Sequence, residues 1–509
     1  MSAVGYAFLH ESLGLSSFEP ACPALIKPVS RIVRNTDHLA VPAAMATRLG
    51  LAGGDALTHL LFALKHEGVN LALLMEALTH LDHDALVAAM RATPGSVFVR
   101  KACYLWEQAT GRSIEGAPAA KGSMADLFDP ARYVTMEGER DSRWRIHFNG
   151  LGTPRYCATL ERSPAVEAGL ASKLTARIRE YTASVGPEIR DRALEWAYLD
   201  ETRSSFAIER EIPSEEKQRA FVALLHAAHR RQDLSEEYLV NLQATAVTNP
   251  LDRAVAFRTE QNYLQGPLRG APGITYIPPP PSLAAELMQE IMSLSRRGVT
   301  SLDPLVAGAV ASFGFVFVHP FMDGNGRLSR FLVHYALCQS GELDNGLILP
   351  VSIAMKAHEA EYLGALQQFS VPARARWQVR WIGDEDYDLR YAGSPGYEIY
   401  RYWDATPAVE FCFRMANEAL ELNLRENTQF LLRYDRVSRA VERLYDVRGS
   451  DLATLVTAAL THNGLVSRRR RDQFSSRVPT VVFDFIEEQA SQALEDAELM
   501  PVSRRQEDG

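Results

Sequence analysis

The sequence is poor in cysteine and has no excess of positive charge. Only five of its 509 residues are cysteines, and they are widely scattered. Such a small, odd number without short spacings fits neither a disulfide framework nor a cysteine metal site, and it favours buried thiols in a reducing compartment. The formal net charge is −9. The basic footprint of a general nucleic-acid-binding protein is therefore missing.

Long apolar runs are also missing. No uninterrupted run reaches the roughly 20 apolar residues that a membrane-spanning helix needs, and the first fifteen residues carry one clear charge, Glu11, without a basic segment that leads into an apolar one. The apolar fraction of 47% and charged fraction of 23% are typical of a globular protein. We therefore expect a cytoplasmic protein of roughly three domains with no contact with a membrane.

The stretch with the most chemistry is His319-Pro-Phe-Met-Asp-Gly-Asn-Gly-Arg-Leu-Ser-Arg330, which holds one histidine, one acid, one asparagine, two glycines and two arginines. The apolar segment 305–318 before it is long enough for a buried helix. After it, apolar residues recur at a period of 3.6 and predict a second helix that begins near Gly326; they are Leu328, Phe331, Leu332, Tyr335 and Ala336. The polar residues are therefore expected in a tight turn between two helices.

Such a turn favours an anion. A helix N-terminus presents N–H groups without intrahelical acceptors and a partial positive charge, so it binds phosphate. Arg327 and Arg330 stand three residues apart in the first turn, where like charges repel and the dipole disfavours cations. Asp323 offers a hard oxygen ligand for Mg²⁺ on a phosphate chain, and His319 is a natural proton acceptor near neutral pH. The alternative is an ordinary polar turn between helices.

These twelve residues resemble the pattern of the Fic (fido) family and match every one of its fixed positions. The resemblance implies a mainly α protein, in which a helical Fic core with a small β-hairpin flap is flanked by largely helical N- and C-terminal domains. It also implies a protein adenylyltransferase that moves AMP from ATP onto a Tyr, Thr or Ser hydroxyl of a target protein, with ATP and Mg²⁺ as cofactors. In this interpretation His319 is the general base and Asp323 holds the metal. The ATP-binding residues are Gly324, Asn325, Gly326, Arg327 and Arg330.

The segment Ser204-Ser-Phe-Ala-Ile-Glu-Arg210 is similar to the Fic inhibitory motif, with Ser205 and Glu209 in place. The resemblance implies an inhibitory helix near residues 200–211, whose Glu209 pairs with Arg330 and occupies the space of the ATP γ-phosphate. The sequence departs from the pattern at Arg210, where the family usually has glycine, so the path of the chain after this helix is open. Without the resemblance, Glu209 is an exposed helix carboxylate. In some relatives the same glutamate supports removal of AMP from the target, which is an alternative activity.

Two further assignments rest on the same resemblance. Helical periodicity breaks between Phe257 and Pro281, which is a surface loop or, in the Fic interpretation, the flap that docks the target's main chain through Ile274, Thr275 and Tyr276. The prolines after it predict that the next helix begins only after Ser282, which would be its N-cap. Tyr362 is a candidate wall of the adenine pocket, with plain core packing as the alternative.

The remaining chain suggests a division into four parts. We expect a helical N-terminal domain at 1–110, a linker and small α/β segment at 111–185, the Fic core at 186–375 and a helical extension at 376–509, with a winged-helix module as an alternative there. Two strands are expected around the turn at Asn149-Gly150. A regulatory or DNA-binding protein on a Fic scaffold is the competing functional class, with nucleic acid disfavoured by charge. Self-modification and a homodimer are further options.

Overall fold

The computed structural model describes residues 2–343, 346–383 and 386–496. The fold is mainly α, as predicted, with small sheets. The chain divides into two compact units. Unit one comprises Met1–Ala171, Arg230–Ser340 and Glu359–Phe413, and unit two comprises Ser172–His229, Gly341–His358 and Arg414–Gly509. Within the described residues, no helix is long and apolar enough to cross a membrane.

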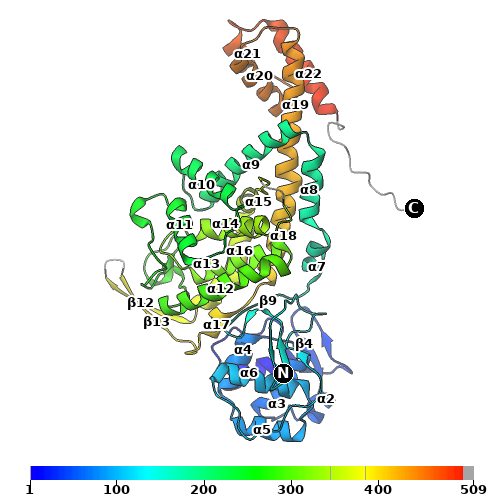
Figure 1. Ribbon diagram of the computed structural model, residues 1–509, viewed down its shortest axis with the longest axis vertical. Helices are drawn as coiled ribbons and strands as arrows, with labels where there is room; N and C mark the ends of the chain where they lie inside the picture. Colours follow the sequence, from blue (N-terminus) through cyan, green and yellow to red (C-terminus); the bar gives the residue numbers. More distant parts are fainter. Residues whose placement is uncertain (1, 344–345, 384–385, 497–509) are drawn as a thin grey trace, which may run out of the picture. The chain divides into compact units, whose positions relative to one another are not determined.

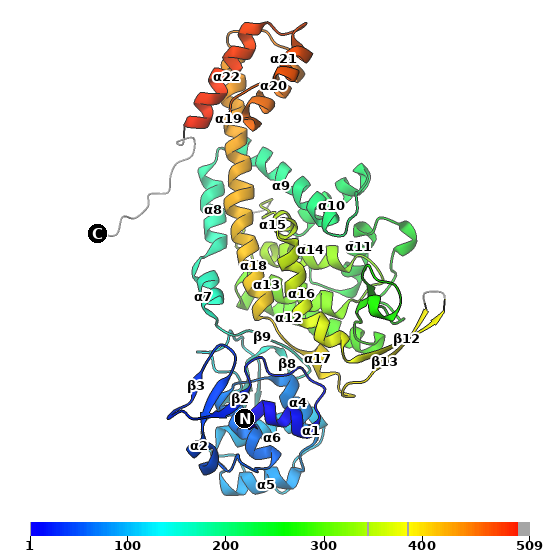
Figure 2. The same ribbon diagram turned by 180° about the vertical axis from the view of Figure 1, so that it is seen from behind.

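The N-terminal part of unit one, coloured blue to cyan in Figures 1 and 2, is built around a leucine-rich helical core. Asp55 caps the third helix by accepting from the backbone N–H of Thr58, and Asn70 caps the fourth by accepting from that of Leu73. The helices are α1 (Gly5–Leu13), α2 (Ala43–Arg48), α3 (Ala56–His66), α4 (Leu71–Thr79), α5 (His83–Ala92), α6 (Val97–Thr110) and α7 (Pro164–Ala171).

The N-terminal domain, which was expected to be helical, also contains strands that the sequence did not predict. A four-stranded sheet in the order β1-β2-β4-β3 lies within the first 42 residues. Its strands have two to four residues, and β4 is buried throughout. A strand is recognised in a sequence by the alternation of apolar and polar residues, and a short apolar run lacks this alternation. The strands are β1 (Ala3–Val4), β2 (Ala24–Lys27), β3 (Val33–Arg34) and β4 (Leu39–Pro42).

Two three-stranded sheets follow. Strands β5 (Ala125–Asp126), β6 (Glu139–Asp141) and β7 (Ile146–Phe148) form one, and β8 (Leu151–Thr153), β9 (Tyr156–Thr159) and β14 (Tyr402–Asp404) form the other. The expected turn at Asn149-Gly150 therefore leads from β7 into β8 rather than joining two paired strands. Residues 111–122 are irregular, as expected. However, Ile114 and Ala120 are buried in the helical core, so this segment is packed rather than a free linker.

Two buried glutamates of the N-terminal part differ in their hydrogen-bond donors. Burial raises the pKa of Glu67 to about 7, and the N–H of Tyr6 is the only donor to its carboxyl group among the residues that the structure describes. Burial also acts on Glu76, but four donors from Ser16 and Ser17 hold its pKa below the ordinary value. A buried acid with a raised pKa costs stability when it ionises, whereas one with a lowered pKa contributes stability when it ionises.

We therefore expect Glu67→Gln to stabilise the protein at pH 8 and to have little effect at pH 4. The cost of ionised Glu67 begins above its unfolded pKa of 4.5 and is complete above about pH 7, so the gain at pH 8 should reach about 3 kcal/mol. Glu76→Gln should instead destabilise at pH 8. Thermal unfolding of both variants at the two pH values tests this, and a gain from Glu67→Gln that does not change with pH contradicts it.

The central part of unit one contains three long helices and a hairpin. Helix α13 (Pro304–Val318) is almost entirely buried, as its apolar sequence predicts, and Asp303 caps it. It packs between α12 (Pro281–Ser301) and α14 (Asn325–Gln339), side by side in Figure 1. Ser282 is not the cap of α12. The helix begins at Pro281 because the first helical position needs no N–H donor. The other elements of this region are α11 (Glu236–Ala246), η1 (Pro250–Asp252), β10 (Leu264–Gln265), η2 (Ala271–Gly273), β11 (Ile274–Tyr276), α16 (Glu359–Arg374), β12 (Trp377–Gly383), β13 (Asp386–Tyr391), α17 (Glu398–Arg401) and α18 (Thr406–Glu418).

The regular elements of unit two are all helical within its described residues. The helical extension predicted at 376–509 is only partly helical, because its first part contains β12, β13 and β14. The carboxylate of Glu201 accepts from the N–H and the hydroxyl of Ser352, at 2.8 and 2.5 Å, and so joins α9 to α15. Between Ala405 and Asp496 the structure contains no strand, so a β wing is absent from this stretch. The elements are α8 (Leu174–Ser184), α9 (Pro187–Ile208), α10 (Glu215–Ala227), α15 (Val351–Ala357), η3 (Ala419–Leu424), α19 (Arg425–Glu442), α20 (Gly449–Thr461), α21 (Arg468–Phe474) and α22 (Thr480–Glu495).

Arg210 adopts the backbone conformation for which glycine is favoured. Its φ is 59°, in the left-handed region. The N–H of Glu211 donates to the carbonyl of Phe206 and that of Arg210 to the carbonyl of Ala207, at 3.1 and 3.0 Å. These two bonds define a Schellman ending of α9, in which the left-handed position is usually glycine. The departure from the family pattern thus changes the residue but keeps the turn.

We expect Arg210→Gly to stabilise unit two by about 0.5–1 kcal/mol. Glycine removes the strain of the left-handed conformation, which is roughly 1–2 kcal/mol. Part of this gain is offset, because glycine gives the unfolded chain more conformational entropy to lose on folding. Arg203→Gly, on the exposed face of the same helix, is the matched control and should destabilise by about 1 kcal/mol. Denaturant unfolding checks the opposite signs. A loss of stability in both variants would show that Arg210 is not strained.

Candidate active site

The twelve-residue motif forms the turn between α13 and α14. Helix α13 ends at Val318, and His319 follows in the left-handed region with a φ of 53°. Gly324, with a φ of 86°, precedes the first residue of α14. A Cβ at position 324 would lie 3.1 Å from Cγ1 of Val247, so both backbone angle and space favour glycine there. The predicted turn between two helices is confirmed.

The imidazole of His319 is held by the helix that it ends. Its Nδ1 lies 3.1 Å from the carbonyl oxygen of Val316, and the side chain is only 7% exposed. A carbonyl can only accept, so in the neutral ring Nδ1 carries the proton and Nε2 carries the lone pair. The contact therefore sets the tautomer that a general base needs.

Asp323 and Arg327 form an ion pair within the motif. The guanidinium Nη2 of Arg327 lies 3.2 and 3.3 Å from the two carboxylate oxygens, and its Nη1 donates to the carbonyl of Ala246 at 2.9 Å. Arg327 is 1% exposed, whereas the side chain of Asp323 is 42% exposed. The two arginines were expected to be neutralised by an anionic ligand. Asp323 therefore supplies part of this negative charge.

Two other motif residues have different surroundings. The side chain of Asn325 accepts from the N–H of Phe321 at 3.0 Å and donates to its carbonyl at 2.8 Å, so its amide holds the shape of the turn. Arg330 is 1% exposed on α14. A guanidinium so deeply buried is stable only when anions or acceptors surround it, since the desolvation of a charge is costly.

Arg258 is a residue of this site that the sequence did not reveal. Its Nε donates to the carbonyl of His319 at 2.8 Å, and its Nη2 donates to the carbonyls of Pro279 and Val318 at 2.5 and 3.4 Å. Its own N–H donates to the carbonyl of Pro320 at 2.8 Å. Burial lowers the pKa of Arg258 to about 10. The guanidinium and the backbone N–H of Arg258 thus together fix the backbone on both sides of His319, and the guanidinium also holds Pro279, after the hairpin.

Two amides complete this support. Asn262 Nδ2 donates to the carbonyls of Phe321 and Met322, at 3.3 and 3.4 Å. Gln243 Nε2 donates to the carbonyl of Asp323 at 3.1 Å. Both residues are buried. A buried amide at such a place needs its partners, but the sequence offers no signal for carbonyl partners that lie 59–80 residues away.

We expect Arg258→Lys to lower kcat of the reaction proposed below by about 10–100-fold with little change in KM for ATP. An ammonium cannot reach carbonyls in the spread geometry of a guanidinium, so the backbone at His319 shifts, and a misplacement of about 1 Å costs about 100-fold. Arg253→Lys, exposed on the same segment, is the control. Steady-state kinetics separate kcat from KM. A variant that raises KM alone would assign Arg258 to nucleotide binding.

The expected hairpin is present as β10 and β11, an antiparallel pair with a bulge. Of the three predicted docking residues, Ile274 and Tyr276 are buried and only Thr275 is exposed. The hydroxyl of Tyr276 donates to the carbonyl of Phe317, and the carbonyl of Ile274 accepts from Nε of Arg374 at 2.9 Å. The hairpin is therefore tied to α13 and α16, and its role in target docking stays a prediction.

The two remaining groups of predicted residues lie elsewhere. Tyr362 is buried between Phe411, with ring centroids 5.7 Å apart, and Phe313, at 6.3 Å. Core packing describes these contacts, and a role in ATP binding stays a prediction. Ser205 is buried in α9 and Glu209 is the exposed C-cap of that helix, both in unit two. Arg330 belongs to unit one, so the pairing of Glu209 with Arg330 also stays a prediction.

The motif has the donor chemistry for ATP and a divalent cation. Asp323 presents a partly exposed carboxylate, a hard ligand that suits Mg²⁺ bound also to phosphate oxygens and water. The first turn of α14, with glycines at 324 and 326, leaves backbone N–H groups for phosphate. The residues therefore fit both groups.

Comparison with known proteins finds a family match that includes the residues of this site. Residues 233–337 match the family model described as Fic/DOC family. A protein adenylyltransferase Fic of Drosophila erecta is 37% identical over 86 residues, which cover 17% of this chain and 16% of that protein. Its counterpart in Drosophila mojavensis is 38% identical over 129 residues, covering 25% and 22%. Protein adenylyltransferase fic-1 of Caenorhabditis elegans is 34% identical over 92 residues, covering 18% and 17%.

The chain thus spans about a fifth or less of the length of the curated relatives that it matches. Two solved structures are more distant. A Fic family protein from Desulfovibrio desulfuricans is 20% identical with a TM-score of 0.34, covering 63% of this chain and 87% of that one. A Fic domain containing signaling protein from Bacteroides thetaiotaomicron is 16% identical with a TM-score of 0.35, covering 52% and 96%. TM-scores below 0.5 add no support. On the family model and the curated relatives, residues 233–337 are a Fic/DOC domain.

Proposed function

We propose that this protein transfers AMP from ATP to a Tyr, Thr or Ser hydroxyl of a target protein. The observation that carries the proposal is the position of His319 beside the N-terminus of α14, with its Nδ1 held by the carbonyl of Val316. The relatives that match the domain are named protein adenylyltransferases. No disulfide joins the cysteines of the described residues, which agrees with a reducing compartment.

The reaction needs one general base and a set of groups that bind the phosphates of ATP and balance their charge. Nε2 of His319 accepts the proton of the target hydroxyl, whose oxygen then attacks the α-phosphorus of ATP in line, and pyrophosphate leaves. The backbone of Gly324, Asn325 and Gly326 holds the phosphates, and Arg330 balances the charge of the γ-phosphate. Catalysis is then mostly positioning and charge stabilisation.

Mg²⁺, bound to Asp323 and the phosphates, would neutralise charge on the leaving pyrophosphate. Asp323 already touches Arg327 through both oxygens. Arg327 therefore orients the carboxylate, and its contact with the carbonyl of Ala246 ties this pair to the end of α11. In this proposal Arg327 acts on ATP chiefly through Asp323.

The proposal includes inhibition by Glu209. Arg330 is deeply buried and requires negative charge around it, and a carboxylate can pair with a guanidinium in bidentate geometry. We propose that Glu209 and the γ-phosphate of ATP compete for Arg330. The Schellman ending at Arg210 supports this role because it fixes the backbone that carries Glu209.

Two labels test the transfer. The Glu209→Gly variant is incubated in a lysate with ATP that carries the label on the α- or the γ-phosphate, and labelled proteins are examined by mass spectrometry. We expect transfer of the α label, as an AMP adduct on a hydroxyl. Transfer of the γ label alone would show phosphate transfer. Absence of both labels, with retention on DNA, would support the regulatory class instead.

A further inference from the structure

Three apolar side chains are exposed at or next to the turn that carries His319. Val255 is 95% exposed and Leu251 is 90% exposed, both on the segment between α11 and the hairpin, and Met322 is 55% exposed within the turn itself. Single exposed apolar side chains are ordinary on a protein surface, whereas those that gather in one place mark an interaction site. We call these three residues the apolar rim.

The buried side chain of Gln243 brings the two parts of the rim together. Its Nε2 donates to the carbonyls of Asp252 and Asp323, at 2.8 and 3.1 Å, and its Oε1 accepts from the N–H of Ala254 at 2.9 Å. Because the two carbonyls share one donor, the segment after α11 lies directly against the catalytic turn. All of these residues belong to unit one.

The segment that carries the rim is also tied down at its other contacts. The N–H of Leu251 donates to the side chain of Asn249 at 3.1 Å, and the N–H of Phe257 donates to the carboxylate of Glu236 at 2.9 Å. The ring of Phe257 meets that of Phe321 edge-on, with centroids 5.5 Å apart. The exposed side chains are therefore presented by an ordered backbone, and a preformed surface loses little entropy on binding.

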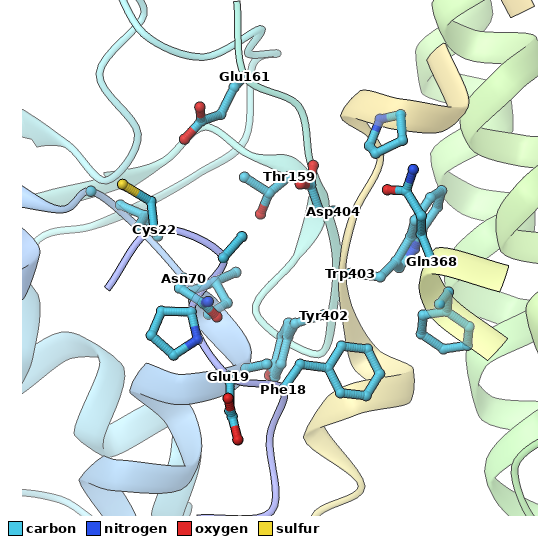
Figure 3. A pocket seen from close by; sticks show the side chains of 18 of the residues that line it. Phe18, Glu19, Cys22, Asn70, Thr159, Glu161, Gln368, Tyr402, Trp403 and Asp404 are labelled. Atoms are coloured by element: carbon cyan, nitrogen blue, oxygen red, sulfur yellow. The ribbon is translucent and has the colours of Figure 1, made fainter. Parts of the chain in front are cut away.

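The cavity of about 670 Å³ shown in Figure 3 is a separate feature of unit one. It lies between the N-terminal part and α16, and its lining includes Phe18, Tyr402 and Trp403. No residue of the turn 319–330 or of the rim is among its lining residues. Of these two apolar surfaces, only the rim includes an exposed residue of the catalytic turn.

AMP transfer to a protein requires that the target lies over this turn. The target's hydroxyl has to reach Nε2 of His319, and a standard protein interface covers about 800 Å² on each partner. Such an area extends well beyond one side chain, so a target in place also covers exposed residues next to the turn. Burial of apolar side chains favours association. A second copy of this chain seated permanently over the turn would instead block the approach of a target.

We infer that the apolar rim docks an apolar patch of the target protein next to its acceptor hydroxyl. The preferred acceptors are then hydroxyls that have large apolar side chains beside them on the target surface. The inference rests on the proposed function and adds to it the class of target surface that the site selects.

The test compares rim variants of the full chain in the Glu209→Gly background, in a lysate with α-labelled ATP. Leu251→Gln/Val255→Gln removes the apolar character of the segment, whereas Leu251→Met/Val255→Ile keeps it. Both positions are almost fully exposed, so neither pair disturbs the core. The polar pair should label target proteins at least tenfold more slowly than the parent and bind ATP with unchanged affinity in calorimetry. The apolar pair should label at the parent's rate.

Leu363→Gln/Val371→Gln is the matched control, because it replaces an exposed apolar pair on α16 and should also label at the parent's rate. Mass spectrometry should find the labelled hydroxyls next to large apolar side chains. The inference is overturned if the polar rim pair labels normally, if the apolar pair or the control pair loses as much labelling, or if the labelled sites lack apolar neighbours.

Sedimentation identifies the competing occupant. If the polar rim pair separates a dimer that the parent forms, a second copy covers the rim and the inference is overturned. Absence of labelling in the parent itself would refute the proposed function, and the inference with it, whereas a labelling parent with a normally labelling polar pair would refute the inference alone.

Discussion

Replacement of His319 by alanine should reduce AMP transfer by about 100–10,000-fold and leave ATP binding intact. A general base contributes a factor of this size, and the imidazole is positioned for that task by the carbonyl of Val316, 3.1 Å from Nδ1. The phosphates depend on other groups, chiefly the start of α14 and the arginines. Transfer is measured with α-labelled ATP, and binding by calorimetry.

The variant His319→Asn distinguishes the loss of the imidazole from a change in the backbone conformation at position 319. Position 319 has a φ of 53°, which alanine adopts at a cost and asparagine tolerates. Both variants should be equally inactive if the imidazole is the base. An asparagine variant with nearly normal transfer would show that alanine acted through the turn and that another group accepts the proton.

Replacement of Glu209 by glycine should raise self-modification and target labelling at least tenfold. In our proposal the carboxylate competes with the γ-phosphate for Arg330, so its loss opens the productive position of ATP. Arg330 is deeply buried, and the proposed charge-assisted contact with it would be worth about 1.5–3 kcal/mol, or roughly 10–150-fold. Labelling rates at a fixed ATP concentration give the measurement.

Glu211→Gly is the matched control, because it removes a nearby acid of the same chain segment. It should leave labelling near that of the parent protein. The double variant Glu209→Gly/Arg330→Ala should lose the gain, since the arginine is the group for which both anions compete. Equal activation by both glycine variants would indicate that a looser helix end, rather than the lost carboxylate, causes the effect.

The helices around the site could be predicted because their signals are local. The apolar run before His319 and the 3.6-residue period after Gly326 give α13 and α14 nearly to the residue. The hairpin at β11 was expected from the resemblance to the Fic family, because the glycines and prolines around it by themselves predicted a surface loop. Position 210 is a subtler case, because the left-handed turn persists although arginine replaces the glycine that would have signalled it.

The supports of the turn could not be predicted because they join distant segments. Arg258 reaches carbonyls 21–61 residues further along the chain, and nothing in its neighbours marks it as buried. The strands near the N-terminus could not be predicted for a different reason. They are too short to show the alternation of apolar and polar residues that indicates a strand. Tyr362 had two interpretations that only its contacts with Phe313 and Phe411 could weigh.

The affinities of ATP and ADP for the parent protein and for Glu209→Gly test the central claim most directly. ADP lacks the γ-phosphate, so it does not compete with Glu209 for Arg330. We predict that the Glu209→Gly variant binds ATP about tenfold or more tightly than the parent, while its Kd for ADP is nearly unchanged. An equal gain for both nucleotides, or no gain for ATP, would contradict competition at Arg330.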